Sequence, residues 1–305
     1  RAVMVGLILA ALVPVILYGT VSYYRTRQQI QTLVASQLSS ITSGGQKQIE
    51  DYIKTRGTAL EQMISAQQFN VMVAAIVNPE SVSKSEAATA PLLLRNFLVL
   101  QSQGPGEAFF DQVMILDSEG VVLASSDSEW INNTFGTIAP GTDPRIRPVF
   151  TKGDSSTLLF NHFLPYQNRF AVATVRTFAI PGSDQTFTSI GFSSSRLFLV
   201  VLDQVTAIFP GANAYYYFEP EKAIMGKGAD PQMAALTAPP SVLSAVLPVI
   251  EGVQTQQPLN FNSFNNQEVL GFVRPIPNTA LSLILEVPTQ SVFGTIPLLD
   301  TFNLY

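Results

Sequence analysis

The chain has 305 residues, of which 47% are apolar and 13% are charged, about half the charged fraction of an average soluble protein. Its 17 basic and 22 acidic residues give a net charge of -5, which argues against a nucleic-acid-binding surface. With no cysteine and one histidine, disulfides, thiolate metal sites, cysteine nucleophiles and multi-histidine metal sites are excluded. We therefore expect no metal and no other cofactor.

Residues 2–24 contain no charged side chain and read AVMVGLILAALVPVILYGTVSYY. A helix of that length crosses a hydrocarbon core about 30 Å thick. Tyr23 and Tyr24 lie at its end and Arg25 follows, as is typical of a membrane interface. We predict a transmembrane helix over 1–24, an inner or plasma membrane location, and an extracytoplasmic chain after it. A cleaved signal peptide is the alternative.

Residues 25–77 contain no proline, and their apolar residues recur three or four positions apart. This spacing predicts a long amphipathic helix continuous with the membrane helix. A narrow apolar stripe on such a helix favours pairing with a second copy, so we expect a parallel homodimer. Gly44 and Gly45 each cost about 1 kcal/mol in a helix, and we expect a kink or break there. A helix hairpin turning at these glycines is the alternative.

After residue 78 the pattern changes to short alternating strands, typical of antiparallel sheets. A helix is predicted over 90–101, followed by a hairpin turned at Asp117–Gly120. The predicted strands are 112–116, 121–125, 157–164, 170–179 and 186–192, with a helix at 197–205. A second cycle comprises a strand at 214–218, a helix at 241–247 closed by Pro248, and a hairpin of 267–275 and 281–287. In the run Tyr215–Tyr217, at least one side chain should face a core.

These elements predict an α+β fold: an N-terminal transmembrane helix, a long helix and two antiparallel-sheet units. The expected domains are the membrane helix at 1–24, the long dimerisation helix at 25–77, and the two units at 78–205 and 206–290. Residues 291–305 are a candidate start of a second transmembrane helix. The two cycles have too little sequence in common to be read as a repeat.

Three segments carry a resemblance to a known family: VMILDSEGVVLASSD, TDPRIRPVF and NNQEVLGFVRPIPNTALSLILEVP. In this order, after a long helix, they resemble the double Cache domain, the tandem PAS-like sensor region of bacterial transmembrane receptors. The resemblance covers essentially the whole chain. It implies signal transduction by a histidine kinase, chemoreceptor or diguanylate cyclase, with a small molecule bound in the membrane-distal PAS-like unit.

The resemblance also implies ligand-binding residues. In amino-acid-sensing members of the family, an arginine of the Arg-x-aromatic segment binds the ligand carboxylate, which implies this role for Arg147, with Phe150 at the aromatic end. A guanidinium suits the task because its fork matches a carboxylate. The alternative for Arg147 is a surface ion pair with Asp143 or Asp154. Arg145 belongs to the same segment.

Other positions depart from the amino-acid pattern. Val149 stands where the family usually has tryptophan, Thr142 where it has tyrosine, and Asn168 near the place of an acidic residue that holds the ligand amine. The resemblance therefore implies a carboxylate ligand without the usual amine site, and leaves a small organic acid, another metabolite or no ligand open.

Further candidate ligand contacts are His162, Tyr166 and Trp130. His162 lies in the predicted strand LLFNHFLPY, where a hydrogen-bonded core histidine is the alternative to a ligand contact or pH sensor. Tyr166 and Trp130 are equally compatible with packing. Asp117 is interpreted as a turn residue.

No G-x-S-x-G, H-E-x-x-H or P-loop motif occurs, so we do not expect an enzyme. The sequence predicts a membrane-anchored ligand-sensing domain for transmembrane signalling. The alternative is a structural or accessory subunit of a membrane complex or surface assembly that reuses a sensor-like fold.

Overall fold

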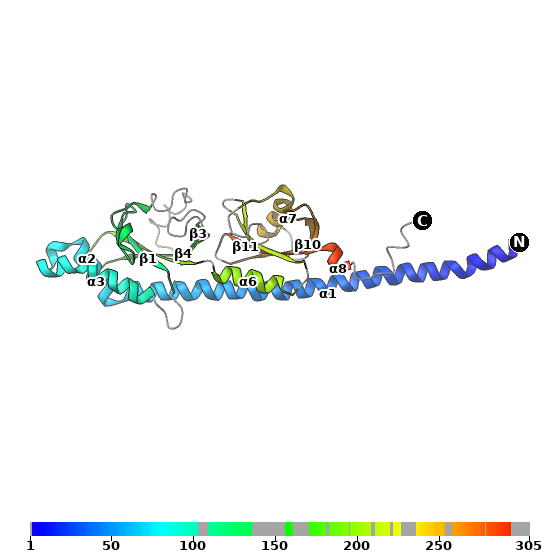
Figure 1. The fold of residues 1–305 in the computed structure, drawn as a ribbon, viewed down its shortest axis with the longest axis horizontal. Helices are drawn as coiled ribbons and strands as arrows, with labels where there is room; N and C mark the ends of the chain where they lie inside the picture. The colour runs from blue at the N-terminus through cyan, green and yellow to red at the C-terminus, as the bar shows by residue number, and fades with distance from the viewer. Residues whose placement is uncertain are drawn as a thin grey trace.

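The computed structural model describes residues 2–102, 109–135, 156–160, 171–180, 183–194, 196–208, 211–219, 222–226, 236–253, 258–277 and 279–293. Figure 1 shows one long helix, α1 (Ala2–Ser65), that runs along nearly the whole molecule with two sheets on the same side of it. We call the sheet farther from the N-terminus the distal sheet and the other the proximal sheet.

Helix α1 is continuous over 64 residues, and the extended backbone of Ala66 (φ -65°, ψ 130°) separates it from α2 (Gln67–Val77). The kink or break predicted at Gly44-Gly45, and the alternative hairpin there, are both wrong. A Cβ atom on Gly45 would lie 3.0 Å from Val201 Cγ1. The missing side chain therefore admits a close neighbour, and this packing outweighs the poor helix propensity of glycine.

Residues 2–24 form the first part of α1. Across the residues that the structure describes, no helix is both long and apolar enough to cross a membrane. At the other end of the chain, α8 (Thr289–Phe293) covers the start of the predicted second membrane helix, and residues 294–305 lie outside the described part. The membrane anchor and the extracytoplasmic location stay predictions.

Helix α2 packs against α3 (Lys84–Ser102) at the end of the molecule opposite the N-terminus (Figure 1), with the short 3-10 turn η1 (Pro79–Ser81) between them. The predicted start of α3 near residue 90 is wrong. Ser83 and Glu86 form a capping box, in which the Glu86 N–H donates to Ser83 Oγ at 3.3 Å and the Ser83 N–H donates to Glu86 Oε2 at 3.0 Å. The helix therefore begins before Pro91.

The distal sheet has the strand order β2-β1-β5-β4-β3, and all neighbouring strands are antiparallel. Its strands are β1 (Gln112–Leu116), β2 (Val122–Ser125), β3 (Ser156–Phe160), β4 (Ala171–Ala179) and β5 (Thr186–Ser194), and the 3-10 turn η2 (Ser128–Trp130) follows β2. Each corresponds to a predicted strand. Helix α6 (Arg196–Thr206) then runs beside α1 toward the proximal sheet (Figure 1).

The proximal sheet has the order β8-β7-β6-β11-β10-β9, also antiparallel. Its strands are β6 (Asn213–Phe218), β7 (Ala223–Met225), β8 (Leu236–Thr237), β9 (Leu259–Asn262), β10 (Glu268–Pro275) and β11 (Leu281–Pro288). Helix α7 (Pro240–Ile250) covers the face away from α1 (Figure 1). Pro248 lies inside α7 and does not close it as predicted. Strands β7, β8 and β9 were not predicted, and β7 and β8 have only three and two residues.

The apolar cores lie between these layers. Val34, Leu38 and Ile49 of α1 share a cluster with α6 and one face of the proximal sheet. The far end of α1 joins α2, α3 and the distal sheet in another cluster. The predicted α+β class with a long N-terminal helix and antiparallel sheets is confirmed.

The tyrosine run lies on β6, a strand with neighbours on both sides, and all three side chains are fully buried. Tyr216 points toward α6, where its hydroxyl donates to the Phe198 carbonyl at 3.0 Å. Tyr215 and Tyr217 pack on the α7 side. The prediction that at least one faces a core is confirmed.

Candidate functional site

The distal sheet has two buried faces. Val113 and Ile115 of β1 pack on the helices at the end of α1. Because side chains alternate along a strand, Met114 and its neighbours on β5 lie on the opposite face. We call this side the outer face, and it is formed by Gln112, Met114, Ser125, Thr188, Ile190 and Phe192.

Polar groups are mixed into the outer face. Gln112, Ser125 and Thr188 are all buried, and Gln112 Nε2 donates to Ser125 Oγ at 3.4 Å. An apolar surface with a few placed polar groups is the usual composition of a small-molecule site. The outer face therefore has the chemistry to hold a small molecule of mixed polarity.

Phe135 brings the segment after β2 onto this face. Its ring stacks on Phe192, with centroids 6.4 Å apart and an interplanar angle of 17°. Its N–H donates to the Gly120 carbonyl at 2.9 Å, and Thr134 forms a bridge with Val121. These backbone contacts with the β1–β2 hairpin hold the Phe135 ring against β5.

Of the six predicted ligand contacts, the described part of the chain contains only Trp130. It lies in η2, which Asp127 caps by accepting the Glu129 N–H at 3.1 Å. Its ring is half-buried, and within the described residues its Nε1 has no hydrogen-bond partner. The other five lie outside the described residues: Arg145, Arg147, Phe150, His162 and Tyr166. Their roles stay predictions.

Asp117 is engaged in the β1–β2 turn. Its Oδ1 accepts the N–H groups of Glu119 and Val121, both at 2.9 Å, and Gly120 supplies the positive φ of 82°. This agrees with its interpretation as a turn residue. A hollow of about 540 Å³ lies beside it, where the end of α2 meets the β4–β5 turn and Asp184.

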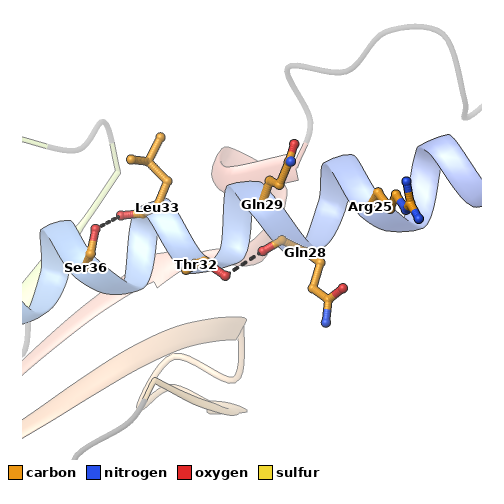
Figure 2. A pocket seen from close by; sticks show the side chains of 6 residues that line it. All are labelled: Arg25, Gln28, Gln29, Thr32, Leu33 and Ser36. Carbon is orange, nitrogen blue, oxygen red and sulfur yellow. Dashed lines mark hydrogen bonds between the residues drawn. The ribbon is translucent and has the colours of Figure 1, made fainter.

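A second hollow, also of about 540 Å³, follows α1 between Arg25 and Ser36. Figure 2 shows that its side chains leave the helix in different directions and do not converge on one point. Thr32 and Ser36 donate to the carbonyls of Gln28 and Leu33, at 2.9 and 2.8 Å. Both hydroxyl protons are therefore engaged in hydrogen bonds within α1. Because the side chains do not converge, the hollow does not have the geometry of a ligand-binding site.

Polar contacts among Ser193, Tyr52 and Arg56 join the distal sheet to α1. Ser193 follows Phe192 on β5 and points to the α1 side, where its Oγ donates to the Phe109 carbonyl at 2.8 Å and hydrogen-bonds with Tyr52 of α1. The Arg56 guanidinium stacks on Tyr52, 3.4 Å from the ring centroid. Burial raises the pKa of Tyr52, and the positive charge of Arg56 offsets part of that rise. The hydroxyl is thus neutral at neutral pH and available as a hydrogen-bond donor.

Comparison with known proteins supports the fold. No model of a known protein family matches the chain, and no curated protein matches its sequence. The structure is similar to the sensor domain of the V. cholerae histidine kinase DctB, with a TM-score of 0.55, 10% identity and coverage of 86% of this chain and 99% of the other.

Two further structures have the same TM-score. The ligand-binding domain of Mlp24 with asparagine is 11% identical over 88% of this chain and 98% of its own. The extracellular domain of rpHK1S-Z16 is 11% identical over 89% of this chain and 98% of its own. The chain therefore shares its fold with extracytoplasmic sensor domains, and the fold implied by the resemblance to double Cache domains is confirmed.

Proposed function

We propose that the chain is the membrane-anchored, extracytoplasmic ligand-sensing domain of a transmembrane signalling receptor. A small molecule binds on the outer face of the distal sheet, and α1 carries the response toward its own N-terminal part, which spans the membrane. The observation that carries the proposal is the pair Phe192 and Ser193. These adjacent residues of β5 connect the outer face on one side to Tyr52 of α1 on the other.

The signal in this proposal is a shift between two arrangements of α1 against the distal sheet. A ligand shifts such an equilibrium only by its difference in affinity for the two arrangements. A ligand touching Phe192 changes the position of β5, and the Ser193–Tyr52 contact passes that change to α1. The parallel homodimer, formed along α1, provides the second copy against which the helix moves.

The proposed ligand is a small molecule that carries a carboxylate. Arg147 binds the carboxylate, Arg145, Phe150 and His162 line the site, and Trp130 and Tyr166 add aromatic walls. The binding of asparagine by the similar Mlp24 domain supports a ligand of this size. The departures at Val149 and Asn168 favour an organic acid over an α-amino acid.

A thermal-shift screen of the purified full chain against small carboxylates, amino acids, amines and purines tests the proposal. A ligand present at about 100 times its Kd adds about 2.7 kcal/mol to the free energy of unfolding, which raises Tm visibly. We expect a carboxylate to raise Tm in the wild type and in Arg95→Ala on α3, and not in Arg147→Ala. The absence of any shift across the library would contradict direct ligand sensing, and an equal shift in Arg147→Ala would contradict the assigned carboxylate contact.

A further inference from the structure

The proximal sheet contains a buried acidic side chain. Glu286 lies on β11, in the otherwise uncharged run LSLILEVP, and its exposed fraction is 0%. It is paired across the sheet with Asn213 and Gly271, and it shares its face with Ile284 and Tyr215. This face is covered by α7 and the apolar side chains of β9, so the carboxyl group lies in an apolar core.

The hydrogen bonds of this carboxyl group are few. The Tyr215 hydroxyl donates to Glu286 Oε1. The Ser263 hydroxyl lies beside the carboxyl group and donates its proton to the Asn265 side chain. Oε2 is buried, and the described residues offer it no hydrogen-bond partner. An ionised carboxylate in this position lacks the two or three donors that it needs.

The described elements packed around Glu286 bring no cation to this face. Helix α7, β6 to β9 and the turn 263–267 contain no acidic or basic residue. Their titratable groups are the hydroxyls of Tyr215, Tyr216 and Tyr217, of which Tyr216 points to α6 on the other face. On β10, Arg274 is turned to α1 and donates to Ser39 Oγ at 3.2 Å, while Glu268 is exposed. Within the described part of the chain, a negative charge on Glu286 is therefore uncompensated.

These surroundings determine the protonation of the group. Burial raises the pKa of Glu286 to about 7, and the hydrogen bond from Tyr215 offsets part of the rise. The carboxyl group is therefore neutral in mildly acidic solution and ionises near neutral pH.

Glu286 also lies next to the element that returns the chain to α1. Strand β11 ends at Pro288 and α8 begins at the next residue. Thr289 Oγ1 donates to the Glu268 carbonyl at 3.0 Å, and Val292 joins the cluster that contains Val34 of α1. Glu286 thus lies three residues before the start of α8, whose Val292 packs in the same cluster as α1.

We propose that Glu286 is a proton-responsive switch. Its ionisation loosens the packing of β9, β10 and β11 under α7, and this weakens the packing of α8 against α1. The neutral group stays in the core with Tyr215. The ionised group draws in water or moves out toward the turn 263–267. This switch does not depend on a bound ligand, and its test is separate from the test of ligand sensing.

Hydrogen exchange of the full chain without ligand tests the switch. At pH 6 and pH 8, with rates corrected for chemical exchange, we expect the protection of 259–293 to fall at least tenfold in the wild type and in Glu268→Gln. In Glu286→Gln, which keeps the neutral form, protection should stay unchanged. Equal losses in the wild type and Glu286→Gln would overturn the proposal, as would no loss in the wild type.

A second pair of variants guards against misfolding of Glu286→Gln. Tyr215→Phe removes the donor that favours the ionised carboxylate, so the midpoint of the pH transition should move upward. Tyr217→Phe is the matched control on the same strand, because its buried hydroxyl has no hydrogen-bond partner within the described residues. An unchanged midpoint in Tyr215→Phe, or the same shift in both variants, would contradict the role of Glu286.

Discussion

Gly45 of α1 and Val201 of α6 meet where a side chain on the glycine would be crowded, because its Cβ atom would lie 3.0 Å from Val201 Cγ1. Leu283 Cδ2 of the proximal sheet is almost as near, at 3.1 Å. The preceding residue, Gly44, has no other atom within 4 Å of such a Cβ atom. Two adjacent glycines in one helix thus have opposite surroundings.

Valine at these two positions separates packing from helix propensity. In Gly44→Val the free energy of unfolding should rise slightly, since valine is a better helix former than glycine. In Gly45→Val it should fall by about 2 kcal/mol, because overpacking a well-filled core costs about 1–3 kcal/mol. Urea denaturation of both variants measures the difference, and equal stabilities would show that α6 does not pack on α1 at Gly45.

The same pair shows how far sequence reasoning extends. The spacing of apolar residues indicated the long helix, since that pattern is local, but the predicted end at residue 77 is wrong, because α1 ends at Ser65 and α2 is a separate helix. The effect of Gly44 and Gly45 was predicted wrongly, because their cost as glycines is local but the benefit at Gly45 comes from residues more than 150 positions away in the chain. The long strands followed from alternation, whereas β7 and β8, with three and two residues, are too short to show a period.

The buried carboxyl group of Glu286 was also missed. Its signal was a single acidic residue within the apolar strand 281–288, a run that was read only as a closing hairpin. That no cation of the described residues faces it depends on α7 and β9, which pattern alone does not place against β11. The five ligand-contact predictions from Arg145 to Tyr166 lie outside the described residues, so only Trp130 has a known position.

Arg274 and Ser39 connect β10 to α1, and their contribution can be measured. The Arg274 guanidinium donates to Ser39 Oγ at 3.2 Å and to the Ser39 carbonyl at 3.4 Å. Arg274→Ala should lower the free energy of unfolding by about 1.5–3 kcal/mol, the range for a hydrogen bond to a charged group. Ser39→Ala should cost less, because the carbonyl remains.

A double-mutant cycle isolates this pair. If the side chains interact as described, the loss in the double variant should be smaller than the sum of the two single losses. Additive losses would mean that the bond to Ser39 Oγ adds no stability and that Arg274 acts through its other contacts, among them the Ser39 carbonyl and the Phe272 ring, whose centroid is 5.1 Å from the guanidinium.

The raised pKa of Glu286 also predicts how stability depends on pH. The folded group titrates at about 7 and the unfolded one near 4.5, so between these values the folded protein binds more protons than the unfolded chain. The contribution of Glu286 to the free energy of unfolding is therefore complete below pH 4.5, falls as the pH rises, and is lost above about pH 7. At 1.36 kcal/mol per pKa unit the loss is about 3 kcal/mol.

Urea denaturation at pH 5 and pH 8 measures this loss. The difference between wild type and Glu286→Gln removes the titration of all other groups. Glu268→Gln, an exposed carboxylate on the neighbouring strand, should keep the wild-type profile. Parallel profiles for wild type and Glu286→Gln would mean that Glu286 titrates alike in the folded and unfolded states.

Trp130 is the sole tryptophan of the chain, and its half-buried ring follows strand β2, whose Ser125 belongs to the outer face. A ligand on that face that contacts or covers the ring should therefore change its fluorescence emission. For a compound that raises Tm, we expect the emission to change along a saturation curve with the same Kd as the thermal response. If the ring only borders the site, Trp130→Phe should lose the fluorescence change and keep the rise in Tm. If the ring binds the ligand, Trp130→Phe should lose both. A compound that raises Tm without changing the emission would show that the ligand binds away from Trp130.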